Sequence, residues 1–198
     1  KDSIKKLSAR PTALLAHSAE LYLNEAFQAE LQSVKEKNSI TNTGVSLYNE
    51  HEINQVLGSD FKPDIIQLPM NILDTRLYRR GILSQLVEEG IEVHTRSAFL
   101  QGLFYLPEFE LKNRFSDAIP YLGKLKSIAE AAGLTLSELS LLWLVSLEEV
   151  SKVVIGIDSA NHLNSHLKSL EKKVTPACFE KALSIHYEND NILNPSNW

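Results

Sequence analysis

Short apolar runs alternate with longer amphipathic stretches along this chain, a pattern typical of parallel strands joined by crossover helices. The apolar runs predict strands over residues 12–16, 40–45, 63–68, 91–95 and 153–157. The amphipathic stretches predict helices over residues 19–37, 49–57, 79–89, 121–132, 135–144, 160–170 and 175–185. The pattern therefore predicts an α/β fold of five βα units, with all 198 residues in a single domain and no internal linker.

Local signals support several of these boundaries. Asn49 is a suitable N-cap, and Gly90 follows a predicted helix where a left-handed C-terminal residue is favoured. Thr135 and Glu138 have the spacing of a capping box, and Ser159 can cap the helix that begins at residue 160. The chain opens without a methionine, in a stretch that we expect to lie inside a helix.

Two segments lack regular periodicity. Residues 96–120 contain Pro107 and several aromatic residues, and irregular segments of this length in compact domains are usually functional, so we expect a lid or binding loop. The segment after residue 185 is expected to be a polar tail.

Composition limits the possible functions. The chain is 43% hydrophobic and 23% charged with a formal net charge of −5, and it lacks the basic excess that binding to nucleic acid requires. No apolar run approaches the roughly 18 to 20 residues of a membrane span, so we expect a cytoplasmic protein without a membrane partner. Cys178 is the only cysteine, and no Cys/His cluster has zinc spacing, so neither a disulfide nor a metal site is expected.

Five βα units suit either an open doubly wound sheet or part of a (β/α)₈ TIM barrel. The first strand is not followed by Gly-x-Gly-x-x-Gly, which argues against a dinucleotide-binding open sheet. The barrel is therefore preferred, although five strands alone cannot close one.

The residues at the strand ends carry a more specific signal, because together they resemble the aldo/keto reductase family. The phrases that carry the resemblance, in the family's order, are Leu14-Leu-Ala-His17-Ser, Thr43-Gly-Val-Ser46, Asp64-Ile-Ile-Gln67-Leu-Pro-Met-Asn71, Arg96-Ser-Ala-Phe99-Leu-Gln101-Gly and Val153-Val-Ile-Gly156-Ile-Asp158-Ser. The resemblance extends to about residue 170. It implies strands four to eight, the C-terminal portion, of the family's barrel.

The resemblance also implies roles for individual residues. His17 would hydrogen-bond the carbonyl oxygen of a small-molecule substrate, an aldehyde or ketone, while Ser46 and Gln67 would hold the nicotinamide carboxamide of NAD(P)H. The other implied cofactor-binding residues are Arg96, Ser97, Phe99, Gln101, Gly156, Asp158 and His162. Asp158 would repel the 2′-phosphate of NADPH, which favours NADH slightly.

The family's catalytic aspartate, tyrosine and lysine have no counterparts at matching positions, so this chain alone is expected to be inactive. The alternative to a reductase is a non-catalytic partial barrel that binds a cofactor or a partner; a barrel lyase or isomerase that shares only the fold is a third possibility. If the chain is complete as given, its outer strands would leave unpaired edges, and an oligomer would be expected.

Overall fold

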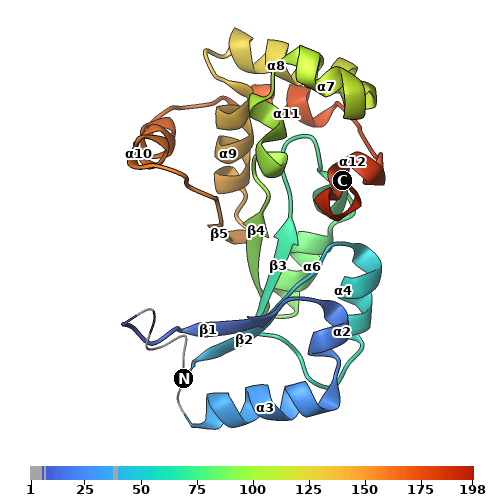
Figure 1. Ribbon diagram of the computed structural model, residues 1–198, viewed down its shortest axis with the longest axis vertical. Coiled ribbons are helices and arrows are strands. Elements are labelled where there is room, and N and C mark those ends of the chain that lie inside the picture. The colour runs from blue at the N-terminus through green and yellow to red at the C-terminus, as the bar shows by residue number, and fades with distance from the viewer. Residues whose placement is uncertain (1–5, 7, 38–39) are drawn as a thin grey trace. The chain divides into compact units, whose positions relative to one another are not determined.

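The computed structural model describes residues 6, 8–37 and 40–198, and these form an α/β fold (Figure 1). The helix expected at the chain start falls largely on residues 1–5 and 7, which lie outside the described residues. The five strands are β1 (Ala13–Ala16), β2 (Asn42–Ser46), β3 (Ile65–Pro69), β4 (Glu92–Arg96) and β5 (Val150–Val153). They form one sheet in the order β1-β2-β3-β4-β5, which confirms the α/β class with βα units in succession.

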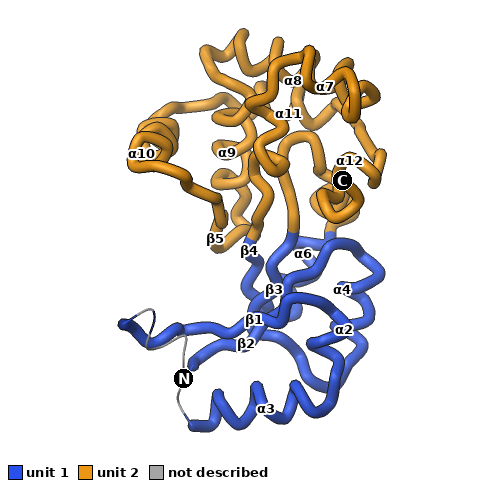
Figure 2. The backbone as a smooth tube through the Cα atoms, viewed as in Figure 1, with its two compact units in different colours: residues 1–68, 82–94 blue, residues 69–81, 95–198 orange. Residues whose placement is uncertain are grey.

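Helices occupy most of the connections between strands. They are α2 (Ala19–Tyr22), α3 (Glu25–Glu36), α4 (Glu50–Leu57), α5 (Arg76–Arg79), α6 (Ile82–Glu88), α7 (Glu108–Arg114), α8 (Ile119–Ala131), α9 (Leu136–Ser146), α10 (Ala160–Ser169), α11 (Pro176–Leu183) and α12 (Asp190–Leu193), with 3₁₀ turns η1 (Leu100–Tyr105), η2 (Ser116–Ala118) and η3 (Pro195–Asn197). The chain divides into two compact units, residues 1–68 with 82–94 and residues 69–81 with 95–198 (Figure 2). They are called unit 1 and unit 2 below.

In unit 1, β1, β2 and β3 pair in parallel, and their register places buried residues of the three strands side by side. Ala16 lies opposite Val45, which lies opposite Ile66, and all three are buried on the same face of the strands. Buried residues of α2, α3 and α4, including Tyr22 and Ile53, complete this core. The short apolar runs of the sequence thus supply the strand side of this core.

Gly44 in β2 occupies a position where the backbones approach closely. A Cβ atom built on it would lie 2.5 Å from the carbonyl oxygen of Ile65 and 3.0 Å from Cγ of Leu15. Only a residue without a side chain fits at this spacing.

An ion pair fixes α3 to the start of β2 and β3 in unit 1. Lys35 Nζ donates to both carboxylate oxygens of Asp64, at 2.8 and 2.6 Å, and the Thr43 backbone N–H and hydroxyl donate to Asp64 Oδ2. Burial by itself raises the pKa of Asp64, but these hydrogen bonds outweigh it and hold that pKa below its ordinary value.

Two long helices expected from periodicity are each divided in the structure. The helix expected over residues 19–37 is interrupted because the Asn24 side chain accepts a hydrogen bond from the Phe27 N–H and so begins a new helix. The helix expected over residues 79–89 begins earlier, at Arg76, and breaks at Gly81, whose φ of 71° is left-handed. Asn49 caps α4, and Thr135 and Glu138 form the predicted capping box of α9.

In unit 2 the central element is α9, which is rich in leucine and buried along most of its length. Its Trp143 is 1% exposed and contacts Tyr78 edge-on, with 5.6 Å between ring centroids. Trp143 is therefore part of the core of unit 2. The only pair of described helices with the length and apolar character of a membrane span is residues 116–131 with 136–146, bent by 80°; no single described helix qualifies.

Three expectations for unit 2 are wrong. Residues 96–120 are largely helical, since η1, α7 and η2 lie within them. The strand expected over residues 153–157 lies earlier, at Val150–Val153, and beyond it only the Val154 N–H still donates to β4, to the Thr95 carbonyl at 2.7 Å, among the backbone hydrogen bonds of the described residues. The C-terminal segment is not simply polar, because Ile192 and Leu193 are buried and the Trp198 ring packs on Phe115.

The C-terminal segment is also held by charge. Arg76 pairs with Asp74 at 2.8 Å and with Asp190 at 2.9 Å. Tyr187 donates its hydroxyl to Asp117 at 2.9 Å, and both burial and this carboxylate raise the pKa of Tyr187. These contacts tie residues 187–190 to the body of unit 2.

Candidate functional site

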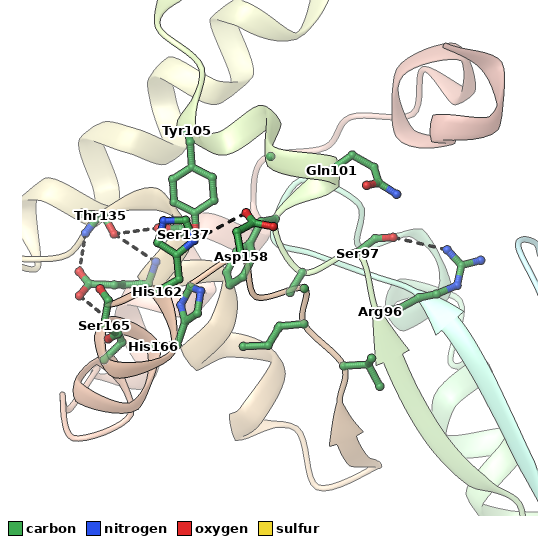
Figure 3. A pocket seen from close by; sticks show the side chains of 18 residues that line it. Arg96, Ser97, Gln101, Tyr105, Thr135, Ser137, Asp158, His162, Ser165 and His166 are labelled. Atoms are coloured by element: carbon green, nitrogen blue, oxygen red, sulfur yellow. Dashed lines mark hydrogen bonds and ion pairs between the residues drawn. The ribbon is translucent and has the colours of Figure 1, made fainter. Parts of the chain in front are cut away.

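Unit 2 contains a cavity of about 940 Å³, within the range typical of small-molecule sites (Figure 3). Its walls come from the end of β4, η1, the start of α9, the segment after β5 and one face of α10. Seven residues chosen from the sequence as cofactor-binding residues line it: Arg96, Ser97, Phe99, Gln101, Gly156, Asp158 and His162. The fold thus gathers residues that lie up to 66 positions apart, from 96 to 162, around one space.

The segment after β4 reaches the cavity in an uncommon backbone conformation. Ser97, Leu100 and Gln101 have φ values of 60°, 45° and 52°, in the left-handed region that non-glycine residues seldom adopt. Such conformations cost free energy and persist where surrounding contacts enforce them, most often at functional sites. Arg96 begins this segment, and its Nη1 donates to Ser97 Oγ at 3.4 Å.

Two buried polar residues enforce this conformation. Asn71 Nδ2 donates to the Ser97 carbonyl at 3.2 Å. Its Oδ1 accepts from the backbone N–H groups of Leu73 and Asp74. Ser140 Oγ in α9 donates to the Ala98 carbonyl at 2.8 Å and accepts from the Ile72 N–H at 3.1 Å. Both side chains are essentially fully buried, so every hydrogen bond they make replaces one that water would otherwise supply.

The wall that follows β5 combines an open backbone with a capped helix. A Cβ atom built on Gly156 would meet no atom within 4 Å, so packing does not require glycine there. Ser159 caps α10 by accepting a hydrogen bond from the His162 N–H, which confirms the expected cap. The first turn of α10 presents backbone N–H groups and the positive end of the helix dipole beside Asp158.

An aromatic pair lines the same space. The Phe99 ring stacks on the His166 ring with centroids 4.9 Å apart and an interplanar angle of 13°, and Tyr105 contacts Phe99 edge-on at 5.6 Å. Burial and the neighbouring charge of His162 lower the pKa of His166. His166 lines the cavity because it lies one helical turn after His162.

A carboxylate on the wall is already neutralised. Glu138 in α9 accepts from Lys172 Nζ at 2.8 Å, from the Thr135 N–H at 2.9 Å and from Ser169 Oγ at 3.2 Å. Burial by itself raises the pKa of Glu138, but these donors outweigh it and hold that pKa below its ordinary value. Only the capping role of Glu138 was predicted, because residues 169–172 are far from it in the chain and no local pattern indicates the contact.

The three remaining predicted residues lie in unit 1, at the carboxyl ends of adjacent strands. Ser46 and Gln67 are register partners in β2 and β3; Ser46 is buried and Gln67 is half-buried. Ala16 pairs with Val45, and His17 follows Ala16 as Ser46 follows Val45. His17 is exposed. The carboxyl ends of parallel strands are where barrel enzymes place their reacting groups.

Other lining residues were not expected from the sequence. They are Ala98, Gly102, Tyr105, Thr135, Ser137, Glu138, Val154, Ile155, Ser165, His166 and Ser169. Among the described residues there is no group of three or more His, Cys, Asp or Glu side chains suited to a metal ion.

Comparison with known proteins agrees with the sequence resemblance. The model of the aldo/keto reductase family matches residues 3–185. A crystal structure of a thermostable aldo-keto reductase in complex with the inhibitor epalrestat is similar, with a TM-score of 0.69 and 20% identity over 93% of this chain and 63% of that chain. An aldo-keto reductase from Bacillus halodurans is similar in its holo form, with a TM-score of 0.71 and 20% identity over 95% of this chain and 67% of that chain. Its apo form gives a TM-score of 0.72, also at 20% identity, over 95% and 68%. At this identity the structures show a shared fold, and the chain spans about two thirds of their length.

Proposed function

Because the chain belongs to the aldo/keto reductase family, we propose that it serves hydride transfer between a nicotinamide cofactor and an aldehyde or ketone. The observation that carries the proposal is the gathering of seven cofactor-binding candidates around one cavity in unit 2. We also propose that the chain corresponds to the C-terminal five βα units, strands four to eight, of a (β/α)₈ barrel. The sequential order of its five strands and the parallel pairing of β1, β2 and β3 support this assignment.

The cavity fits the adenosine and diphosphate part of such a cofactor. Gly156 leaves open space where a side chain would stand, so a ligand can approach the backbone there. The capped start of α10 offers N–H donors to a phosphate. The stacked rings of Phe99 and His166 offer an aromatic surface to the ligand. Arg96 offers a guanidinium that can bind an anionic group.

Taken by itself, unit 1 carries side chains that suit a nicotinamide and a carbonyl substrate. Ser46 and Gln67 would hold the carboxamide through a hydroxyl and an amide, which both donate and accept hydrogen bonds. His17 would donate a hydrogen bond to the carbonyl oxygen of the substrate and so orient it. A bound nicotinamide supplies the hydride, and these side chains orient the ring and stabilise the charge that develops on oxygen.

We propose that the chain favours NADH. Of the described side chains that line the cavity, Glu138 and Asp158 are acidic, and Arg96 alone carries a permanent positive charge. Asp158 is exposed on the wall beside α10, where a 2′-phosphate would meet its negative charge. We expect Asp158→Lys to strengthen NADPH binding more than NADH binding.

We propose further that binding, rather than turnover, is what this chain performs alone, because the family's proton-donating tyrosine has no counterpart at a matching position. A non-catalytic module is the second candidate, favoured by that same absence. A cytoplasmic location is part of the proposal, since the free thiol of Cys178 suits a reducing compartment.

Titration of the chain with NADH and with NADPH, followed by the fluorescence of the reduced nicotinamide, tests the proposal. Gly156→Leu would fill the cavity wall and should weaken NADH binding by at least about tenfold. Gly123→Leu is the matched control, because Gly123 also has open space around it but lies on the exposed surface of α8. Saturable binding that only Gly156→Leu weakens supports the cofactor site; no binding by a folded wild-type chain overturns it.

A separate assay distinguishes the enzyme from the module. NADH oxidation is followed with an excess of a simple aldehyde, using the wild-type chain and His17→Ala. Turnover that His17→Ala abolishes would contradict the proposal that this chain alone only binds. Binding without turnover supports that proposal.

A further inference from the structure

The α10 wall of the cavity carries two titratable side chains one helical turn apart. His162 and His166 both line the cavity, with Ser165 and Ser169 on the same helix face. His162 Nδ1 lies 3.7 Å from Asp158 Oδ2, and His166 stacks on Phe99 (Figure 3). Both imidazoles therefore stand where an anionic group of a ligand beside α10 would meet them.

The charges that face this pair from the other walls nearly balance at neutral pH. Arg96 from β4 is positive, and Asp158 is negative. Glu138 from α9 is negative but is paired with Lys172 at 2.8 Å. Burial, followed by the charge of Glu138, raises the pKa of Tyr105 from η1, so that phenol stays neutral.

Protonation of the two histidines would thus change the charge of the cavity from near zero to about two positive charges. Histidine is the side chain type whose charge changes between about pH 5 and pH 8, and the carboxylates, guanidinium and phenol of the other lining residues keep their charge over that range. A ligand with more phosphate groups gains more from these positive charges than one with fewer.

We propose that His162 and His166 select the cofactor according to pH, so that acidification increases the acceptance of a 2′-phosphate. This inference rests on the proposed function, since it assumes that adenosine phosphate lies beside α10. At neutral pH the wall disfavours the 2′-phosphate through Asp158; in mild acid the imidazolium groups offset that carboxylate and attract the phosphate.

The magnitude follows from Coulomb attraction. A positive and a negative charge about 4 Å apart in a water-like medium attract by an amount worth about a fivefold change in affinity. Two such charges, reduced by salt screening, should change the preference by about tenfold. The 2′-phosphate itself takes up a proton near a pKa of about 6, which acts in the opposite direction and must be removed by comparison with a variant.

The experiment measures calorimetric affinities of 2′,5′-ADP and 5′-AMP for the full chain at about pH 8 and about pH 6. These probes differ in the 2′-phosphate and need only the adenosine side of the site. The variants are His162→Gln with His166→Gln, and His162→Gln alone, since His162 is exposed and its replacement should not disturb the fold. His51→Gln, on the exposed surface of α4, is the control.

The preference is the affinity for 2′,5′-ADP divided by that for 5′-AMP, and its change from about pH 8 to about pH 6 is the measured quantity. This change should be about tenfold larger in the wild type and in His51→Gln than in the double variant. His162→Gln alone should give a smaller part of this rise. The same pH profile in the wild type and the double variant would overturn the selector and leave the cofactor site intact. Failure of both probes to bind the folded wild type at either pH would overturn the cofactor site, and the selector with it.

Discussion

Replacement of Gly44 by alanine tests the close approach of β2 and β3. The new Cβ would lie 2.5 Å from the Ile65 carbonyl oxygen, roughly 0.8 Å short of an ordinary C···O separation of about 3.3 Å. The atom in the way belongs to the backbone, so a strand must move. We take the upper end of the overpacking range, about 3 kcal/mol, for such a shift.

The change also restricts the unfolded chain, which returns about 1 kcal/mol, so the net loss of unfolding free energy should be about 2 kcal/mol. For a chain of this length that corresponds to a fall in Tm of about 4–8 °C. Thermal unfolding followed by far-ultraviolet circular dichroism measures it. Gly156→Ala is the matched control, because no atom lies within 4 Å of its added Cβ, and it should be as stable as the wild type or slightly more stable. Equal stability of Gly44→Ala and Gly156→Ala would refute the reasoning.

Three further predictions concern polar contacts. Ser140→Ala should lower the unfolding free energy by about 1–3 kcal/mol, because it leaves a buried N–H and a buried carbonyl without a partner; urea titration should show no such loss for Ser127→Ala on the exposed face of α8. Asp64 has a lowered pKa in the folded state, so its stabilisation is present above the ordinary aspartate pKa and is lost as the pH falls through the folded value. Asp64→Asn should therefore lose less stability than the wild type when the pH falls from about 5 to about 3. The difference should be under about 1 kcal/mol because the pair is partly exposed. Urea midpoints that fall equally in the two proteins over this pH range would contradict this. Arg76→Ala removes the pairing with Asp190 and should speed limited proteolysis of the C-terminal segment; an unchanged cleavage rate would show that apolar packing alone holds it.

The sequence was most informative where local chemistry determines structure. Asn49 and Ser159 cap the helices that their positions predict, because an N-cap needs only its own side chain and the next three residues. It was less informative at Asn24, where the apolar spacing continues through a cap that ends one helix and begins another. Apolar spacing indicates which face of a helix is buried, but it does not indicate where the helix axis changes direction.

The strand predicted over residues 153–157 illustrates a second limit. Val154 and Ile157 are 43% and 44% exposed, so their apolar character does not reflect burial in the sheet. They lie in the segment that passes the cavity, where an apolar wall is useful for a ligand and looks like a strand in the sequence.

The candidate site was predicted through its resemblance to a family and only in part. Six of the seven predicted residues come from phrases at strand ends and His162 from the start of α10, whereas Glu138 lies in α9 and His166 lies further along α10. The spacing of His162 and His166, four residues apart, was the available signal for the second histidine. The hydrogen bonds of Ser140 depend on three segments meeting, which no local pattern contains.

The left-handed segment after β4 has a consequence for how this chain would respond to artificial selection. At Ser97 and Gln101 a glycine would adopt the observed backbone at lower cost, while Leu100 is fully buried and repays its conformation through packing. A library selected for heat resistance alone should therefore collect glycine at positions 97 and 101 and leave position 100 unchanged. The same library selected for retention of ligand should reject those glycines, because they would loosen the wall of the cavity. The two outcomes would map, residue by residue, where thermal robustness and ligand retention compete in this protein.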